Sequence, residues 1–383
     1  MWIDSFICFL SFQKPRSGFY QLYDAKRFLG LSIGEADTTR LIGMNLPFSV
    51  VPDEQQHAVF RIVSNTSQNG PNGEYWNVKP EEVSMYVLKT VLASAQNQLP
   101  PCASLIESGG KQPAVITIPA AFAESQRAAT RDAAQKAGFD VKLLLPEPTA
   151  AALAYFHKNP DFERSGIYLV FDFGGGTLDV SILNFEKDTS TYKVLACEGD
   201  TFLGGRDIDE GLLTILSKKL VEHDIEVFPS NGKEPTAKQL KHQVELREAA
   251  CVAKRQLTNE ANVPLDLSGV LDDDLELDLY LTREDLRAVM NEVTVLPTNP
   301  PTQASINDRI VTVLQRAIDN AQIHSNQVTG VIMAGGSSNL YGIEDIIRKA
   351  FGSNCKVTLV ISVYLLGCSC VRCCLNIFLL SFD

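Results

Sequence analysis

The stretch FDFGGGTLDVSIL (171–183) holds three consecutive glycines between two carboxylates, Asp172 and Asp179. Consecutive glycines let several backbone N–H groups converge on one anion, because no Cβ atom obstructs the approach. Two carboxylates beside a phosphate would repel it unless a divalent cation lay between them, and Mg²⁺ is held in this way by carboxylates and phosphate oxygens. The residues therefore indicate a phosphate and metal site, with a structural hairpin that has a flexible tip as the alternative.

The residues after the glycines predict a strand rather than a helix. Leu178, Val180 and Ile182 alternate with more polar neighbours, and this period of two is typical of a β-strand. We therefore expect strands at 167–172 and 178–183, with the glycines at the tip of a hairpin. A P-loop is excluded, because no Gly-Lys-Ser/Thr follows the glycines.

A second loop, GVIMAGGSSNL (330–340), places Gly335, Gly336 and Ser337 after an apolar run. We expect a strand at 330–334 and a helix over 339–352, so that the helix N-terminus faces an anion. Glu147 lies between the strand-like KLLL and a helix opened by Pro148. The residues alone favour a first-turn glutamate stabilised by the helix dipole over a ligand contact.

The elements around these loops predict an α/β fold with two lobes. Further helices are expected over 79–98, 123–138, 147–156, 206–228, 234–258 and 305–323, with strands at 114–119 and 142–145 and short strands within 262–281.

Composition narrows the class of protein. A chain of 383 residues is long enough for two domains or one two-lobed unit. The formal net charge of −12 argues against a nucleic-acid partner, which requires an excess of Lys and Arg. The nine cysteines are scattered and predict reduced thiols rather than a disulfide framework.

The two ends differ from the middle. Residues 1–20 lack the features of a secretory signal, so we expect a cytoplasmic protein. Residues 357–383 are apolar and Cys-rich, but Arg372 argues against a membrane span, and the single Cys370-x-x-Cys373 pair is a weak metal signal. We expect this tail to lie outside the fold, with palmitoylation or tail anchoring as alternatives.

Several motifs occur together in order: VITIPAAFAESQRAATRDAAQKAG, PEPTAAALAY, FDFGGGTLDVSIL, FLGGRDID, AKRQLT and MAGGSS. Over residues 23–352 the chain resembles the nucleotide-binding domain of the heat shock protein 70 (DnaK-type) chaperones, within the actin-like ATPase superfamily. The resemblance implies a two-lobed fold, with lobe I at 23–165, lobe II at 166–352, a non-family segment at 1–22 and the tail at 353–383. It also implies ATP hydrolysis coupled to protein folding.

The resemblance assigns roles by position. Pro119 and Arg127 match its relay between nucleotide state and peptide affinity. The implied catalytic residues are Lys26, Glu147 and Asp172, and Mg²⁺ would be held by Asp172 and Asp179. The implied ATP-binding residues are Gly174, Gly175, Gly176, Thr177, Gly204, Gly205, Lys254, Arg255, Thr258, Gly335, Gly336 and Ser337.

Departures from the family pattern limit the expected activity. Residues 1–22 hold no Asp-Gly-Thr-Thr hairpin, Cys251 replaces a glutamate, and Asn339 replaces the arginine that stacks on adenine. The closing Asn-Pro-Asp-Glu segment and a peptide-binding domain are also missing, so the fold is expected to be incomplete, with an unpaired strand edge. We expect weak nucleotide binding and poor or no hydrolysis, because losing one phosphate loop removes charge stabilisation.

Two alternatives stay open. The chain acts either as an ATP-hydrolysing chaperone domain or as a non-hydrolysing binding module that meets co-chaperones and nucleotide-exchange factors. A sugar kinase of the same superfamily is disfavoured by the Ser-Gln-Arg helix (125–127) and by Gly-Gly-Arg-Asp-Ile-Asp (204–209).

Overall fold

The computed structural model describes residues 10–13, 19–22, 24–34, 38, 48–63, 75–98, 110–158, 165–189, 191–228, 237–267, 277–296, 302–352, 355–359 and 378–380. The chain divides into two compact units, Met1–Ala154 with Val363–Asp383, and Tyr155–Ser362. The predicted α/β class is confirmed. The predicted domain limits, with a boundary at 165/166, remain predictions.

The first unit contains three small sheets, with strand orders β1-β2, β3-β4-β5 and β17-β6-β7. The strands are β1 (Leu10–Gln13), β2 (Phe19–Leu22), β3 (Ser49–Pro52), β4 (Ala58–Val63), β5 (Tyr75–Val78), β6 (Gln112–Ile118), β7 (Phe139–Pro146) and β17 (Phe378–Leu380). The helices are α1 (Ala25–Phe28), α3 (Pro80–Gln98), α4 (Glu124–Ala137) and α5 (Glu147–Lys158), whose last turn belongs to the second unit.

Helices α3 and α4 pack on the β6–β7 pair through a core that includes Leu88, Ile116 and Phe139. The small side chains of Ala133, Ala134 and Ala137 form the buried face of α4 in this core. Helix α4 begins where the Ala123 N–H donates to the Gln126 side chain at 3.0 Å, and it ends at Gly138, whose φ of 108° suits only glycine well. The predicted helix over 123–138 is therefore confirmed.

The C-terminal residues differ from the expectation that 353–383 lies outside the fold. Strand β16 (Lys356–Leu359) pairs in parallel with β15 of the second unit, and β17 pairs in parallel with β6 from Ala114 to Ile116. Strand β17 thus covers this part of β6, and the unpaired strand edge expected for a truncated fold stays a prediction. Cys370 and Cys373 lie outside the described residues.

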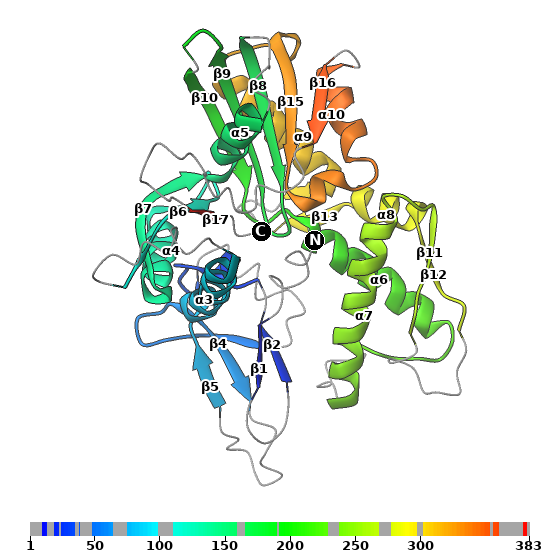
Figure 1. Ribbon diagram of the computed structural model, residues 1–383. Coiled ribbons are helices and arrows are strands. Elements are labelled where there is room, and N and C mark those ends of the chain that lie inside the picture. The colour runs from blue at the N-terminus through cyan, green and yellow to red at the C-terminus, as the bar shows by residue number, and fades with distance from the viewer. Residues whose placement is uncertain are drawn as a thin grey trace. The chain divides into compact units, whose positions relative to one another are not determined.

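The second unit is built on a five-stranded sheet of order β10-β9-β8-β15-β16 (Figure 1). Its elements are β8 (Gly166–Phe173), β9 (Leu178–Glu186), β10 (Thr191–Asp200), α6 (Gly205–Val221), α7 (Ala237–Gln256), β11 (Asn262–Pro264), β12 (Tyr280–Thr282), α8 (Arg283–Asn291), β13 (Thr294–Leu296), β14 (Thr302–Ala304), α9 (Ile306–Ala321), β15 (Val328–Ala334) and α10 (Ile343–Phe351), with 3-10 turns η2 (Ser325–Gln327) and η3 (Gly336–Asn339).

Both faces of this sheet are covered. On one face Phe171 and Val180 join a core with residues of α9 and α10. On the other, Phe156 in the last turn of α5 stacks on Phe185 with ring centroids 4.2 Å apart (Figure 1). Strands β8 and β9 are consequently buried along most of their length, so their side-chain alternation separates two covered faces rather than a core from solvent.

Several predicted boundaries were wrong. The helix expected over 206–228 ends at Val221, and the helix expected over 339–352 begins only at Ile343, after Gly342 with φ 90°. Helix α8 was not predicted, although Thr282 and Asp285 form a capping box in which the Asp285 N–H donates to the Thr282 hydroxyl at 3.1 Å.

Helix α9 also begins with a capping box, which is formed by Ser305 and Asp308. The Ser305 N–H and hydroxyl donate to Asp308 at 3.0 and 2.7 Å, and these bonds hold the pKa of Asp308 below its usual value. We expect Ser305→Ala to lower the free energy of unfolding by about 1 kcal/mol in urea titrations at neutral pH. Because the folded pKa is lowered, the part of this contribution that comes from the hydroxyl bond to the Asp308 carboxylate is present above the unfolded pKa and is lost as pH falls through the folded value. An equal loss at acid and neutral pH would contradict this account.

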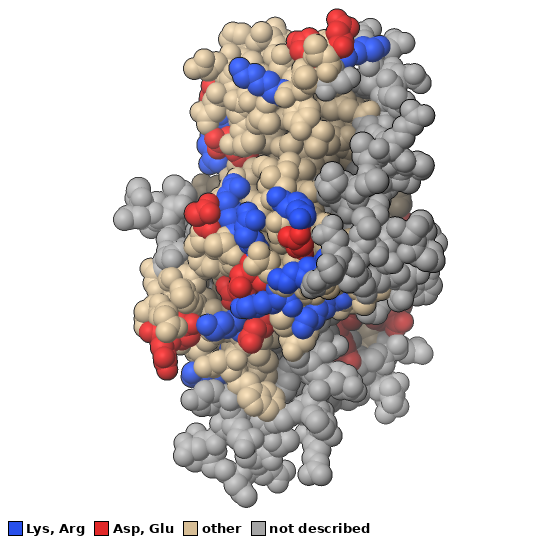
Figure 2. All heavy atoms as spheres, turned by 60° about the vertical axis from the view of Figure 1, so that its left-hand side comes forward, with Lys and Arg blue, Asp and Glu red and all other residues tan. Residues whose placement is uncertain are grey.

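The surface mixes charges of both signs. Figure 2 shows one face of the molecule, on which Lys and Arg side chains lie among Asp and Glu side chains. On α4, for example, Lys136 Nζ lies 2.6 Å from Asp132 Oδ2. Exposed ion pairs such as this one contribute little to the free energy of unfolding. Within the described part of the chain, no helix is both long and apolar enough to cross a bilayer.

Candidate functional site

The glycine loop is the tip of a β-hairpin, as predicted. Strands β8 and β9 are antiparallel, with Asp172 opposite Asp179, and the Gly174 N–H donates to the Thr177 carbonyl at 3.0 Å. Both carboxylate residues are buried, at 6% and 1% exposure. Since paired residues of antiparallel strands share a face, the two aspartates lie on the same face of the sheet, next to the tip.

The tip is bonded to the first turn of α6. The N–H groups of Gly205 and Arg206 donate to the carbonyls of Gly174 and Gly175 at 3.0 and 2.9 Å. The first N–H groups of a helix have no partner within the helix, so the tip satisfies two of them. A Cβ atom on Gly204 would lie 2.4 Å from the Gly175 oxygen, which explains why glycine stands at this junction.

The second loop lies beside the end of β8. Gly335 has φ +80°, and a Cβ atom there would lie 2.4 Å from the Phe173 oxygen and 2.7 Å from Asp172 Oδ1. The Ser338 hydroxyl accepts from the Phe173 N–H at 3.2 Å. The expected strand–loop–helix geometry is wrong, however, because the four-residue turn η3 intervenes and α10 begins at Ile343.

A buried ion pair joins α6 and α7 under these loops. Lys254 Nζ lies 2.8 Å from Asp209 Oδ1 and donates to the Gly205 carbonyl at 2.9 Å. A Cβ atom on Gly205 would lie 2.2 Å from Ser337 Oγ and 3.0 Å from Lys254 Nζ, so these three predicted residues meet at one point. Asp209 was not predicted; its only sequence signal is its place in the Gly-Gly-Arg-Asp-Ile-Asp motif.

The remaining adenosine-side residues lie at the end of α7. Arg255 is exposed on the last turn and Thr258 is half-buried in the turn that follows, where its N–H donates to the Arg255 carbonyl at 3.3 Å. Gly175 and Gly336 are exposed, while Gly176 is half-buried and Thr177 is buried. The structure thus gathers the predicted phosphate residues closely and places Arg255 and Thr258 at a helix end.

In the first unit, two predicted catalytic residues form an ion pair. Lys26 Nζ on α1 donates to Glu147 Oε1 at 2.9 Å, and the side chains are 24% and 2% exposed. Glu147 is the first residue of α5, directly after β7. Its carboxylate is therefore held by a cation as well as by the helix N-terminus.

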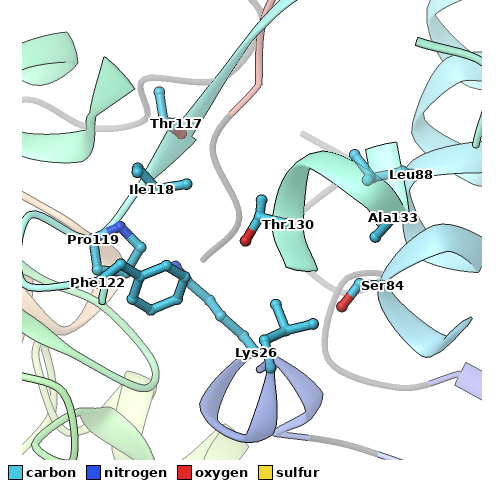
Figure 3. A pocket seen from close by; sticks show the side chains of 10 residues that line it. Lys26, Ser84, Leu88, Thr117, Ile118, Pro119, Phe122, Thr130 and Ala133 are labelled. Atoms are coloured by element: carbon cyan, nitrogen blue, oxygen red, sulfur yellow. The ribbon is translucent and has the colours of Figure 1, made fainter. Parts of the chain in front are cut away.

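Lys26 also lines a cavity between α1, α3, α4 and the end of β6. Figure 3 shows its side chain reaching toward Phe122 and Pro119, with Leu88 and Ala133 on other walls. The cavity volume of about 20 Å³ is enough for a water molecule but not for a nucleotide. The cavity surrounds the Lys26 stem with mostly apolar groups and leaves the amine for Glu147.

Pro119 and Arg127, the proposed relay residues, lie on one local network. Arg127 donates to the carbonyls of Phe122 and Ala120 at 2.9 and 3.3 Å, and the Phe122 N–H donates to the Pro119 carbonyl at 3.3 Å. Arg127 therefore fixes the turn between β6 and α4.

Other chemistries find little support in the described residues. In that part of the chain, no group of three or more His, Cys, Asp or Glu side chains is arranged so that it could hold a metal ion. Burial raises the pKa of the Cys197 thiol, which lies 3.1 Å from the Ser181 hydroxyl, and burial likewise raises that of Cys355. Both thiols are thus poor nucleophiles at neutral pH.

Comparison with known proteins now identifies the family. The model of the family "Hsp70 protein" matches residues 20–360. The chain is 32% identical over 323 residues to a heat shock cognate HSP70 protein of Trypanosoma brucei brucei, covering 82% of this chain and 43% of that protein. It is 32% identical over 330 residues to the mitochondrial heat shock 70 kDa protein of Pisum sativum, with 83% and 42% covered.

A third relative is the chaperone protein DnaK of Prochlorococcus marinus strain MIT 9515, 31% identical over 336 residues, with 87% of this chain and 45% of that protein covered. The chain spans less than half the length of these curated relatives. The mixed α/β architecture agrees with the actin-like ATPase domain of the family. With a match over most of its length, the chain belongs to the heat shock protein 70 family.

Proposed function

We propose that the chain is an ATP-binding domain of a heat shock protein 70-like chaperone, and that its second unit holds the phosphates. The observation that carries this proposal is the hairpin tip Gly174–Thr177, which is bonded to α6 and lies next to the Gly335 loop. Glycines at both loops allow backbone N–H groups to approach an anion closely. The family membership supports ATP as the ligand whose phosphates these loops would bind.

We further propose that Mg²⁺ binds with ATP at Asp172 and Asp179. Asp172 and Asp179 are buried directly opposite each other on neighbouring strands, so both residues lie on one face of the sheet beside the hairpin tip. Two carboxylates fit Mg²⁺, which takes few protein ligands and completes its shell with water and phosphate oxygens. When bound, the ion would supply charge neutralisation at the phosphates.

For hydrolysis, the resemblance points to Lys26 and Glu147 of the first unit. The ion pair at 2.9 Å fixes the orientation of the Glu147 carboxylate, which can then orient a water molecule. By the resemblance alone, Lys26 is the proposed source of positive charge during phosphoryl transfer.

A second candidate is a module that binds ATP without hydrolysing it. Strands β1 and β2 form an antiparallel hairpin, but their sequences, LSFQ and FYQL, contain no glycine, aspartate or threonine to hold phosphate. Under either reading, the resemblance makes co-chaperones and nucleotide-exchange factors the proposed partners. The cytoplasm stays the proposed compartment.

The test is thermal unfolding with and without Mg²⁺–ATP, beside Asp172→Asn. A ligand at 100 times its dissociation constant adds about 2.7 kcal/mol, which raises Tm by roughly 5–10 °C. We expect the wild type to show this rise and Asp172→Asn to lose most of it. An unchanged Tm in a cooperatively unfolding wild type would overturn ATP binding.

Phosphate release then separates the two candidates. If the chain hydrolyses ATP, Lys26→Met should slow release by about 100-fold while the Tm rise persists. A wild type that shows the Tm rise but releases no phosphate is the non-hydrolysing module.

A further inference from the structure

A single arginine contacts both the turn that ends α7 and Tyr341, which follows the Gly335–Ser337 loop. Arg283, the first residue of α8, donates from Nε to the Leu257 carbonyl at 2.9 Å and from Nη2 to the Thr258 carbonyl at 2.8 Å. Its own N–H donates to the Ala261 carbonyl at 2.9 Å. The last carbonyls of a helix lack partners within the helix, and a cation there also suits the helix dipole, so Arg283 fixes the turn that ends α7.

The same guanidinium lies over the ring of Tyr341, with its Cζ 4.1 Å from the ring centroid. Tyr341 follows the Gly335–Ser337 loop and is half-buried. Arg287, one turn further along α8, lies over the same ring at 5.0 Å and contacts the Tyr341 hydroxyl. A cation within about 6 Å of a ring centroid is attracted to the face of the ring.

We propose that Arg283 and Tyr341 are positioning residues for the nucleoside part of the ligand. Through them the end of α7, which carries Lys254, Arg255 and Thr258, is tied to the loop that carries Gly335 and Ser337. This inference rests on the proposed function. A loop already held in place loses less freedom when a ligand binds, so the pair raises affinity without touching the ligand.

The forked shape of Arg283 is what the arrangement requires. Two carbonyls accept from two different nitrogens while the central carbon of the group lies over a ring. Lysine offers a point charge without the planar fork, so it can keep the charge but not all three contacts. For Tyr341 the ring is the essential part, because the stacking contact with Arg283 does not involve the hydroxyl.

The first measurement needs no nucleotide. Hydrogen exchange of the amides at 254–258 and 336–342 is compared in the full ligand-free chain for the wild type, Arg283→Lys, Tyr341→Leu and Tyr341→Phe. We expect about tenfold faster exchange in both segments for Arg283→Lys and Tyr341→Leu, and nearly wild-type exchange for Tyr341→Phe. Unchanged exchange in Arg283→Lys and Tyr341→Leu overturns the link between the two elements.

The second measurement is calorimetric binding of Mg²⁺–ATP and of Mg²⁺–tripolyphosphate, which lacks the nucleoside. We expect Arg283→Lys and Tyr341→Leu to weaken ATP about tenfold and tripolyphosphate less than twofold, with Tyr341→Phe restoring ATP affinity. The matched control is Arg348→Met, which removes an exposed arginine paired with Glu344 in the same unit.

The outcomes separate the two proposals. If the wild type binds ATP and the variants bind it equally well, or if both ligands weaken alike, the positioning role is overturned and the proposed function stands. If the wild type binds neither ligand, the proposed function fails, and the hydrogen-exchange result still decides whether Arg283 and Tyr341 link the two elements.

Discussion

Gly335→Ala is expected to destabilise the second unit by about 3 kcal/mol or more and to abolish nucleotide binding. The backbone at Gly335 has φ +80°, which L side chains rarely adopt. An added Cβ atom would also lie 2.4 Å from the Phe173 oxygen and 2.7 Å from Asp172 Oδ1. Neither neighbour can yield freely, since the first is backbone in β8 and the second is a buried carboxylate.

The adjacent glycine provides the control. A Cβ atom on Gly336 meets nothing within 4 Å, so Gly336→Ala should change the free energy of unfolding by less than about 0.5 kcal/mol. Both variants are compared by urea unfolding monitored by circular dichroism. Similar midpoints for the two would mean that β8 and the loop are not in close contact, against the geometry described above.

Lys254→Met should have an effect of similar size, about 3–5 kcal/mol, because it leaves the buried Asp209 carboxylate without its cation. The substitution also removes the donor to the Gly205 carbonyl at 2.9 Å, which loosens the first turn of α6 beneath the hairpin tip. Arg255→Met, at the exposed next position of the same helix, should cost less than about 0.5 kcal/mol.

A double variant tests whether the unpaired Asp209 carboxylate causes the loss of stability in Lys254→Met. Lys254→Met with Asp209→Leu removes both charges, and it should recover most of the stability that Lys254→Met loses. Urea midpoints of the single and double variants measure this coupling. A double variant as unstable as the sum of its parts would assign the loss to packing rather than to the buried carboxylate.

Local patterns predicted the parts of this fold that depend on neighbours in the sequence. The alternation of Leu178, Val180 and Ile182 was enough to place a strand after the glycines, and hence a hairpin. The alanine-rich run ending at Gly138 was enough for α4, because helix propensity and the left-handed end residue agree there. These signals require no knowledge of distant residues.

Features that depend on contacts between distant residues could not be predicted in this way. From residues alone, Lys26 reads as a surface lysine, since its partner Glu147 is 121 positions away. The role of Lys254 in binding the ligand stays a prediction from the resemblance, and its ion pair with Asp209 of another helix has no signal in the neighbouring residues. Strand β17 has no local signal that distinguishes an apolar tail from a strand, and its pairing with β6 joins residues far apart in the chain.

The N–H groups of Gly205 and Arg206 bond the first turn of α6 to the hairpin tip, so the helix can pivot about its N-terminus. The helix has 17 residues and is about 25 Å long, so a tilt of about 5° at the tip displaces its far end by about 2 Å. At that end Lys219 is bonded to Asp285 and to the Tyr280 carbonyl, both at the junction of β12 and α8. A small shift of the glycines would therefore strain the contacts that Lys219 makes with Asp285 and the Tyr280 carbonyl at the far end of the helix.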